Sequence, residues 1–248
     1  MSIENEKKQW LDSVGLYYRN EDGKLTSYFV YNTIAALHQI GIVPSDLGPS
    51  VLMIGLGGVG IMCNALQSAE NVDLTVIEGS KKVIDEYIAT GKNKANIIHT
   101  LFEDYSPNKL FDTIYGVNVL EHVDNPVAVM QKVKTWCCKG GRGIFIVPNA
   151  DSLHRRIGVE MGLLTHREQL HESEKLGGHK RTYRVETLSL DLEKAGWYVQ
   201  EVRGYTLKVL SQKQMKDFPR EFHDASLRVS LGLVPECCSN LLAICRDI

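Results

Sequence analysis

The sequence predicts an α/β fold, a three-layer sandwich in which a parallel sheet lies between two layers of helices. From Val51 onward, short apolar segments rich in Val, Ile and Leu alternate with segments of about 10 to 15 residues whose apolar positions have helical spacing. This alternation is typical of βαβ units, whose strands join one parallel sheet. The 248 residues, 44% of them hydrophobic, suit one such domain with a full core of its own.

Residues 1–45 precede the alternating pattern and are predicted to form an N-terminal helical lid on the domain at 46–248. Apolar positions at helical spacing run from Tyr28 to Ile40. Two interpretations remain open: the helices pack on the domain as structural elements, or they close over a ligand with their tyrosines. The tyrosines concerned are Tyr17, Tyr28 and Tyr31.

The elements of the domain follow from apolar runs and from the residues that punctuate them. Strands are expected at Val51–Gly55, Asp73–Glu78, Ala95–His99, Phe111–Val117, Gly143–Val147, Trp197–Val202 and Asn240–Cys245. Helices are expected from Ile61 to about Ala69 and at Lys81–Thr90, Pro126–Trp136, Val185–Ala195 and Ser211–Ala225. Lys139–Gly141 is predicted to be a turn before the fifth strand. Residues 150–182 interrupt the alternation of strands and helices and are rich in His, Arg, Glu and Gly. They are predicted to be an insertion after that strand.

Composition excludes several classes of protein. The net charge is −2, so no polycationic surface is expected to bind nucleic acid. No apolar run reaches the roughly 18 residues of a membrane helix, and the first ten residues have no apolar segment of a signal peptide. The six cysteines form no C-x-x-C pair, so we expect free thiols and a cytoplasmic location. No metal site is predicted, because the carboxylates lack a recognisable ligand spacing.

A Gly-rich corner follows the first strand. Gly55, Gly57 and Gly60 form a G-x-G-x-x-G pattern between a strand and a helix. Glycine there lets the backbone approach a ligand closely, and the new helix directs unpaired N–H groups toward it. Glu78 closes the second strand, at the place where an acid accepts hydrogen bonds from ribose hydroxyls in doubly wound folds. The sequence therefore predicts a nucleotide-type cofactor at this edge of the sheet.

The same corner also fits an NAD-dependent oxidoreductase, which remains an alternative. Such an enzyme needs a proton-transfer residue in a suitable setting. The Tyr-x-x-x-Lys pair near the sheet is Tyr105 and Lys109, and Pro107 between them argues against the helix that would bring the two side chains together.

Five segments between about residues 50 and 205 carry a more specific resemblance. They are VLMIGLGGVG, TVIEGS, LFEDY, FDTIYGVNVLEHVDNP and KGGRGIFIVPN. Together they resemble class I S-adenosylmethionine-dependent methyltransferases, and within them the group of ubiquinone-pathway O-methyltransferases and small-molecule methyltransferases. The resemblance implies a seven-stranded Rossmann-like sheet whose last strand, Asn240–Cys245, runs antiparallel. It also implies methyl transfer from S-adenosyl-L-methionine to an O or N atom of a small-molecule acceptor.

The resemblance further implies a pose for the cofactor. The implied contacts are Gly55, Gly57 and Gly58 at the methionine part, Glu78 and Gly79 at the ribose, Phe102, Glu103 and Asp104 near the adenine, Asn118 and Val119 near the sulfonium, and the segment Leu120 to His122 near the adenine or the acceptor.

The chain departs from the family pattern at Met53, where an acid usually precedes the first glycine by two residues. That acid commonly helps to hold the cofactor's ammonium group, so Tyr17, Tyr28 or Tyr31 is a candidate to compensate. The departure keeps a further alternative open, in which the protein binds S-adenosylmethionine as a sensor or cleaves or cyclises its aminocarboxypropyl chain.

The acceptor is expected beyond the fifth strand, because loops at the carboxyl edge of a parallel sheet meet substrates. Basic and histidine side chains there suit a carboxylate or phosphate on the acceptor, although a solvated surface segment would have the same composition. The candidate substrate-binding residues are Asn149, His154, Arg155, His179 and Tyr183. Histidine can accept a proton near neutral pH, and the candidate bases are His122, His154 and His179. A monomer or a homodimer is expected.

Overall fold

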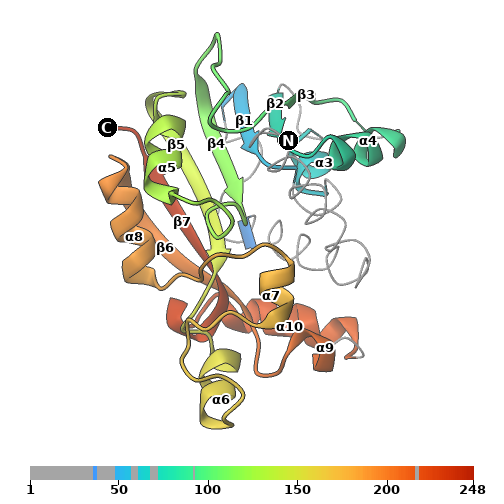
Figure 1. The fold of residues 1–248 in the computed structure, drawn as a ribbon, viewed down its shortest axis with the longest axis vertical. Helices are drawn as coiled ribbons and strands as arrows, with labels where there is room; N and C mark the ends of the chain where they lie inside the picture. Colours follow the sequence, from blue (N-terminus) through green and yellow to red (C-terminus); the bar gives the residue numbers. More distant parts are fainter. Residues whose placement is uncertain (1–35, 38–47, 57–60, 68–71, 92, 216–217) are drawn as a thin grey trace, which may run out of the picture.

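One seven-stranded sheet organises the chain (Figure 1). The computed structural model describes residues 36–37, 48–56, 61–67, 72–91, 93–215 and 218–248. The strands are β1 (Ser50–Ile54), β2 (Asp73–Glu78), β3 (Asn96–His99), β4 (Phe111–Val117), β5 (Cys137–Pro148), β6 (Tyr198–Leu207) and β7 (Cys238–Arg246). Their order in the sheet is β3-β2-β1-β4-β5-β7-β6, and β7 runs antiparallel to both of its neighbours. The predicted mostly parallel sheet with an antiparallel last strand is confirmed.

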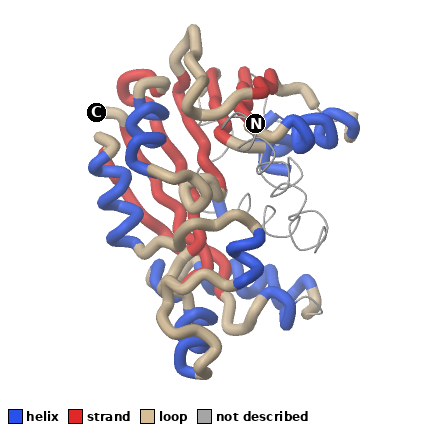
Figure 2. Tube along the Cα trace, viewed as in Figure 1, coloured by secondary structure: helices blue, strands red, loops and turns tan. Residues whose placement is uncertain are grey.

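Helices lie on both faces of this sheet (Figure 2). They are α3 (Ile61–Gln67), α4 (Lys81–Ala89), α5 (Pro126–Lys134), α6 (Leu153–Glu160), α7 (Glu172–Leu176), α8 (Val185–Lys194), α9 (Gln212–Met215) and α10 (Arg220–Ser230), with a short 3-10 helix, η3, at Pro235–Cys237. Of the helices in the described residues, none is long and apolar enough to cross a membrane.

Alternate residues of the central strands supply two separate cores. Leu52 and Ile54 of β1 belong to the core that α5 and α8 cover, whereas Val51 and Met53 belong to the core that α3, α4 and α10 cover. Successive side chains of a strand point to opposite faces, so a strand buried on both sides needs an unbroken apolar run. The run VLMI meets that need, and the three-layer arrangement follows from it.

The fifth strand differs from its prediction. β5 begins at Cys137, so the predicted turn at Lys139–Gly141 is wrong. The pairing with β4 shifts register between Phe111 and Thr113, as at a β-bulge, and Gly140 adopts φ +78°. The Gly140 N–H donates to Asp247 O at 2.9 Å, and the Asp247 N–H donates to Gly141 O at 3.0 Å. Backbone pairing with the end of the chain therefore carries the two glycines inside the strand.

The region after β6 also differs from its prediction. The helix expected at Ser211–Ala225 is instead two helices, α9 and α10, and Pro219 caps the second one with an extended backbone. A helix rarely continues through the residue before a proline, so Pro219 starts a new one. The new helix runs on to Ser230, whose hydroxyl accepts a hydrogen bond of 2.8 Å from the Thr206 N–H of β6.

Residues 150–182 hold α6 and α7, joined and flanked by loops. At the two ends of this segment Asn149 and Tyr183 form an isolated parallel bridge, so the segment begins and ends side by side. The division into a lid at 1–45 and a domain at 46–248 stays a prediction, since 1–35 and 38–47 lie outside the described residues.

Candidate functional site

Glu78 joins the ends of two neighbouring strands. Its carboxylate accepts a hydrogen bond of 2.8 Å from the Leu56 N–H, just after β1, and another of 2.8 Å from the Ser80 N–H. Burial raises the pKa of Glu78, and these backbone donors oppose the shift. Gly55 makes the turn possible with φ +80°, which a residue with a side chain rarely adopts. Glu78 therefore fastens the start of the Gly-rich corner to β2.

The segment after β3 comes to the same edge. The Thr100 N–H donates to Glu78 O at 3.0 Å, which places the chain that follows β3 next to the end of β2. Phe102 is partly buried, whereas Glu103 and Asp104 are exposed in the turn beyond. Glu78 and the turn at residues 102–104 are both predicted cofactor contacts, and they thus lie at the ends of adjacent strands.

The segment after β4 lies beside the corner. Asn118 has φ 52°, is exposed, and donates its N–H to Ile146 O at 2.9 Å. Val119 and Leu120 are buried, and a Cβ added at Gly55 would lie 3.5 Å from Val119 Cγ2. The carboxyl ends of β1, β2 and β4 therefore converge on one edge of the sheet, where doubly wound folds bind ligands.

Met53 is 1% exposed and packs in the core beneath α3 and α4. Five predicted cofactor contacts lie outside the described residues and stay predictions. They are Tyr17, Tyr28, Tyr31, Gly57 and Gly58.

Glu121 lies in the segment predicted to be near the adenine or the acceptor, and no catalytic or metal-binding role was predicted for it. It is 0% exposed, and neither carboxylate oxygen has a hydrogen-bond partner in another described residue. Burial raises the pKa of Glu121 to about 8, although its own backbone N–H and the charge of Arg181 lower it. A signal was present in the sequence: two adjacent polar residues, Glu121 and His122, follow the apolar pair Val119-Leu120.

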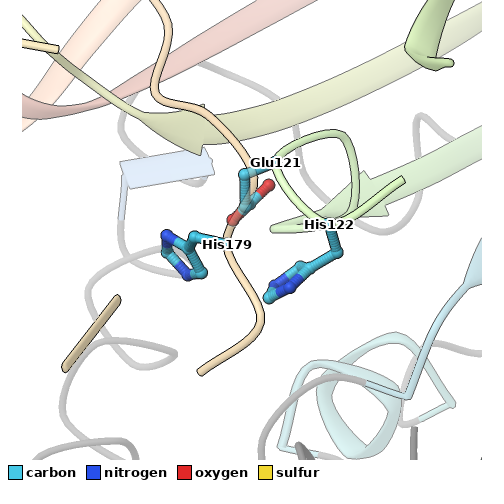
Figure 3. Close-up of side chains that lie close together, drawn as sticks. All are labelled: Glu121, His122 and His179. Carbon is cyan, nitrogen blue, oxygen red and sulfur yellow. The ribbon is translucent and has the colours of Figure 1, made fainter. Parts of the chain in front are cut away.

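Two histidines lie beside Glu121 (Figure 3). The rings of His122 and His179 meet edge to face, with their centroids 4.8 Å apart. Burial is the main cause that lowers the pKa of His122 to about 4 and that of His179 to about 3. We call Glu121, His122 and His179 the Glu121 cluster.

The last residues of the insertion bring His179 to this place. The Lys180 N–H donates to Glu121 O at 2.7 Å, and Arg181 donates from Nη1 to Leu120 O at 2.8 Å and from Nη2 to Asp124 O at 3.0 Å. Lys180 Nζ also pairs with the Asp124 carboxylate. The end of the insertion is therefore fastened to the segment that follows β4.

His154 lies apart from these contacts, in the first turn of α6. Its Nδ1 is buried and has no hydrogen-bond partner among the described residues. Burial and the charges of Lys208 and Arg155 lower the pKa of His154 to about 3, and the pKa of Lys208 falls to about 8, mainly through burial.

The other predicted substrate contacts have partners within the protein. Asn149 Nδ2 donates to Pro235 O at 3.0 Å and to Cys238 O at 2.7 Å, and Asn149 Oδ1 accepts from the Asp151 N–H at 2.9 Å. Arg155, also buried, pairs with Glu174 at 3.1 Å and donates to Gln169 O at 3.2 Å. The Tyr183 hydroxyl donates to Asp191 Oδ2 at 3.3 Å. These contacts give each side chain a structural role, and a role in binding an acceptor stays a prediction.

Replacing Tyr183 with Phe tests the structural role. The variant loses the hydrogen bond to Asp191 and keeps the buried ring, so we expect the free energy of unfolding to fall by about 1 kcal/mol. The midpoint of thermal unfolding should fall by roughly 2 to 4 °C. An unchanged midpoint would show that the hydroxyl does not stabilise the fold.

Comparison with known proteins agrees with this arrangement. Residues 32–202 match the family described as "Methyltransferase domain". Among curated proteins, the ubiquinone biosynthesis O-methyltransferase of Rickettsia canadensis is 25% identical over 131 residues, which are 50% of this chain and 55% of that protein. The chain thus spans about half the length of this relative.

Solved structures share the fold at lower sequence identity. A chain from the complex between the Haloferax volcanii Trm112 methyltransferase activator and the putative methyltransferase has a TM-score of 0.65 at 13% identity, covering 95% of this chain and 98% of its own. The N-methyltransferase NodS from Bradyrhizobium japonicum, in complex with S-adenosylhomocysteine, has a TM-score of 0.57 at 15% identity, covering 96% and 98%.

Proposed function

Because this chain belongs to the methyltransferase domain family, we propose that it transfers the methyl group of S-adenosylmethionine to an oxygen or nitrogen atom of a small-molecule acceptor. S-adenosylmethionine is the cofactor that this membership implies. The observation that carries the proposal is the convergence of the ends of β1, β2 and β4 on one edge, with the end of the insertion fastened to the segment that follows β4. The relatives support both atoms, since one is named an O-methyltransferase and another an N-methyltransferase.

The cofactor pose that we propose uses the ends of four strands, β1, β2, β3 and β4. Each Glu78 carboxylate oxygen accepts one backbone hydrogen bond and can accept another, so both can also bind ribose hydroxyls. The corner at Gly55 would hold the methionine part, the Phe102–Asp104 turn would meet the adenine, and Asn118 and Val119 would face the sulfonium. Adjacency of these segments at one edge supports this assignment.

The acceptor would lie between the segment after β4 and the insertion. Lys180 and Arg181 lower the pKa of His122 by their charge, and Lys208 and Arg155 act in the same way on His154. Cationic side chains near both histidines support an acceptor that carries a carboxylate or phosphate.

The chemistry needs a lone pair of the acceptor in line with the sulfonium methyl group, and positioning supplies much of the rate enhancement. An acceptor that begins protonated also has to lose its proton. His122, His154 and His179 remain the candidate bases, and single replacements by Ala would separate them, since only the base is required for turnover in a folded protein.

A ligand comparison tests the cofactor. S-adenosylmethionine and S-adenosylhomocysteine should raise the midpoint of thermal unfolding by roughly 5 to 10 °C at about 100 times their dissociation constants, since binding there stabilises by about 2.7 kcal/mol. NAD should leave the midpoint unchanged. A shift with NAD and none with S-adenosylhomocysteine would overturn the proposal in favour of an oxidoreductase.

Product analysis tests the reaction. We expect mass spectrometry to find S-adenosylhomocysteine and a methylated product in a panel of hydroxyl and amino compounds that bear a carboxylate or phosphate. Methylthioadenosine formed from S-adenosylmethionine alone would show that the aminocarboxypropyl chain reacts instead.

We also propose a cytoplasmic location, which the six free cysteines support because thiols persist in a reducing compartment. A monomer or homodimer stays a prediction.

A further inference from the structure

The Glu121 cluster combines three side chains that metal ions bind. One ligand atom from each of Glu121, His122 and His179 lies within 4.8 Å of the others, and the three side chains converge in Figure 3. Two come from the segment after β4, and the third comes from the end of the insertion. Their proximity is a tertiary contact and not a helical spacing.

The carboxylate of this cluster is buried with the charge of Arg181 nearby but forms no ion pair with it. No ion pair of the described residues includes Glu121. The nearby cations bind other groups: Lys180 pairs with Asp124, Arg155 pairs with Glu174, and Arg181 donates to backbone carbonyls. A buried carboxylate costs several kcal/mol unless it is paired or coordinates a cation.

We propose that Glu121, His122 and His179 bind a divalent transition-metal cation such as Zn²⁺. Two imidazoles and one carboxylate are a ligand set for Zn²⁺ and Fe²⁺, and three protein ligands leave coordination positions open. Mg²⁺ prefers oxygen ligands alone, so it fits this set poorly. Bonds of about 2.0 to 2.2 Å to one ion would draw the ligand atoms closer to one another than 4.8 Å.

The surroundings of the histidines fit such a site. His122 donates a hydrogen bond to the Gly178 backbone, and metal-binding histidines commonly use their second ring nitrogen in this way. Gly178 has φ +79°, a conformation that glycine favours, and it turns the chain immediately before His179. Lys180, the residue after His179, is held in place because its N–H donates to Glu121 O. The backbone on both sides of His179 therefore holds that ring beside Glu121.

The metal would have a consequence for the acceptor that rests on the proposed function. Asn118 and Val119 immediately precede the cluster, so an open coordination position would lie near the methyl donor. An acceptor with a hydroxyl group could bind the metal through its oxygen there, and His154 would be the remaining candidate base, since His122 and His179 would hold the ion. Metal binding itself does not depend on the proposed function.

Calorimetric titration of the metal-free full-length chain with ZnCl₂ tests the site. We expect one high-affinity site in the absence of cofactor and acceptor, and no comparable binding of Mg²⁺. Glu121→Gln and His179→Ala should each weaken Zn²⁺ binding by about 100-fold or more, since loss of even an outer contact to a ligand costs 10- to 100-fold. His166→Ala is the matched control, because His166 is an exposed histidine of the same insertion and should leave the affinity unchanged.

Two further measurements keep the outcomes separate. Far-ultraviolet circular dichroism should show that the Glu121→Gln and His179→Ala variants are folded, so that a loss of binding reports the ligand. Equal Zn²⁺ affinity in the wild type and both variants would place the ion elsewhere, for example on a thiol, and would overturn the inference. The thermal shift with S-adenosylhomocysteine is read on the same protein, so failure of the metal site and failure of the cofactor assignment are distinguishable.

Discussion

Replacing Glu78 with Ala is expected to weaken the binding of S-adenosylhomocysteine by about 100-fold or more. The variant removes the acceptor of two backbone hydrogen bonds, at Leu56 and Ser80, together with the proposed ribose contact. Hydrogen bonds to a charged group contribute about 1.5 to 3 kcal/mol each, and about 1.4 kcal/mol is a factor of ten in affinity. Calorimetric titration with S-adenosylhomocysteine measures the loss.

Asp73 provides the matched control for Glu78. It lies at the opposite end of β2, is exposed, and pairs with Lys109 on the surface. Asp73→Ala should therefore leave the affinity within about twofold, because exposed ion pairs contribute little. Equal affinities in the Glu78 and Asp73 variants would contradict the proposed cofactor site.

Replacing Asn149 with Leu should destabilise the protein strongly. The amide makes three buried hydrogen bonds, which join the end of β5 to Pro235, to Cys238 and to the start of the insertion at Asp151. Leu fills a similar volume and makes none of them, so we expect a loss of about 3 kcal/mol or more in the free energy of unfolding. Thermal unfolding should show a fall of roughly 6 to 12 °C in the midpoint.

Asn149→Asp distinguishes the structural role from a role in acceptor binding. It keeps an oxygen that accepts from the Asp151 N–H but places its second carboxylate oxygen against the Pro235 and Cys238 carbonyls, so its midpoint should fall at least as far as that of Asn149→Leu. A Leu variant that unfolds like the wild type but no longer methylates an acceptor would instead support the substrate contact.

Much of the fold could be predicted from local pattern. The strands β2 and β4 have the predicted bounds, and β1 agrees within a residue, because continuous apolar runs such as VLMI occur where both faces of a strand are buried. The start of β5 could not be predicted. Gly140 and Gly141 suggest a turn, and only their backbone bonds to Asp247, at the far end of the chain, keep them within a strand.

Part of the candidate site could also be predicted from the sequence, and part of it could not. Gly55 and Glu78 could be proposed from sequence because a glycine turn and an acid recur at fixed places in doubly wound folds. The hydrogen-bond partners of Asn149 could not be proposed from sequence. Pro235 and Cys238 lie far along the chain from Asn149, and no sequence motif links them to it. The proximity of Glu121, His122 and His179 could not be predicted for the same reason, since His179 is far from the other two in the sequence. No metal site was therefore predicted.

The sequence by itself determined the order of strands and helices, the Gly-rich corner and the acid beside it, because each depends on residues close together in the chain. Only the tertiary structure decided which polar side chains of the insertion point inward and what they meet. His179 reaches Glu121 because Lys180 and Arg181 bind the backbone of the segment after β4. Such contacts depend on how the chain returns to the sheet, and no local period in the sequence encodes that return.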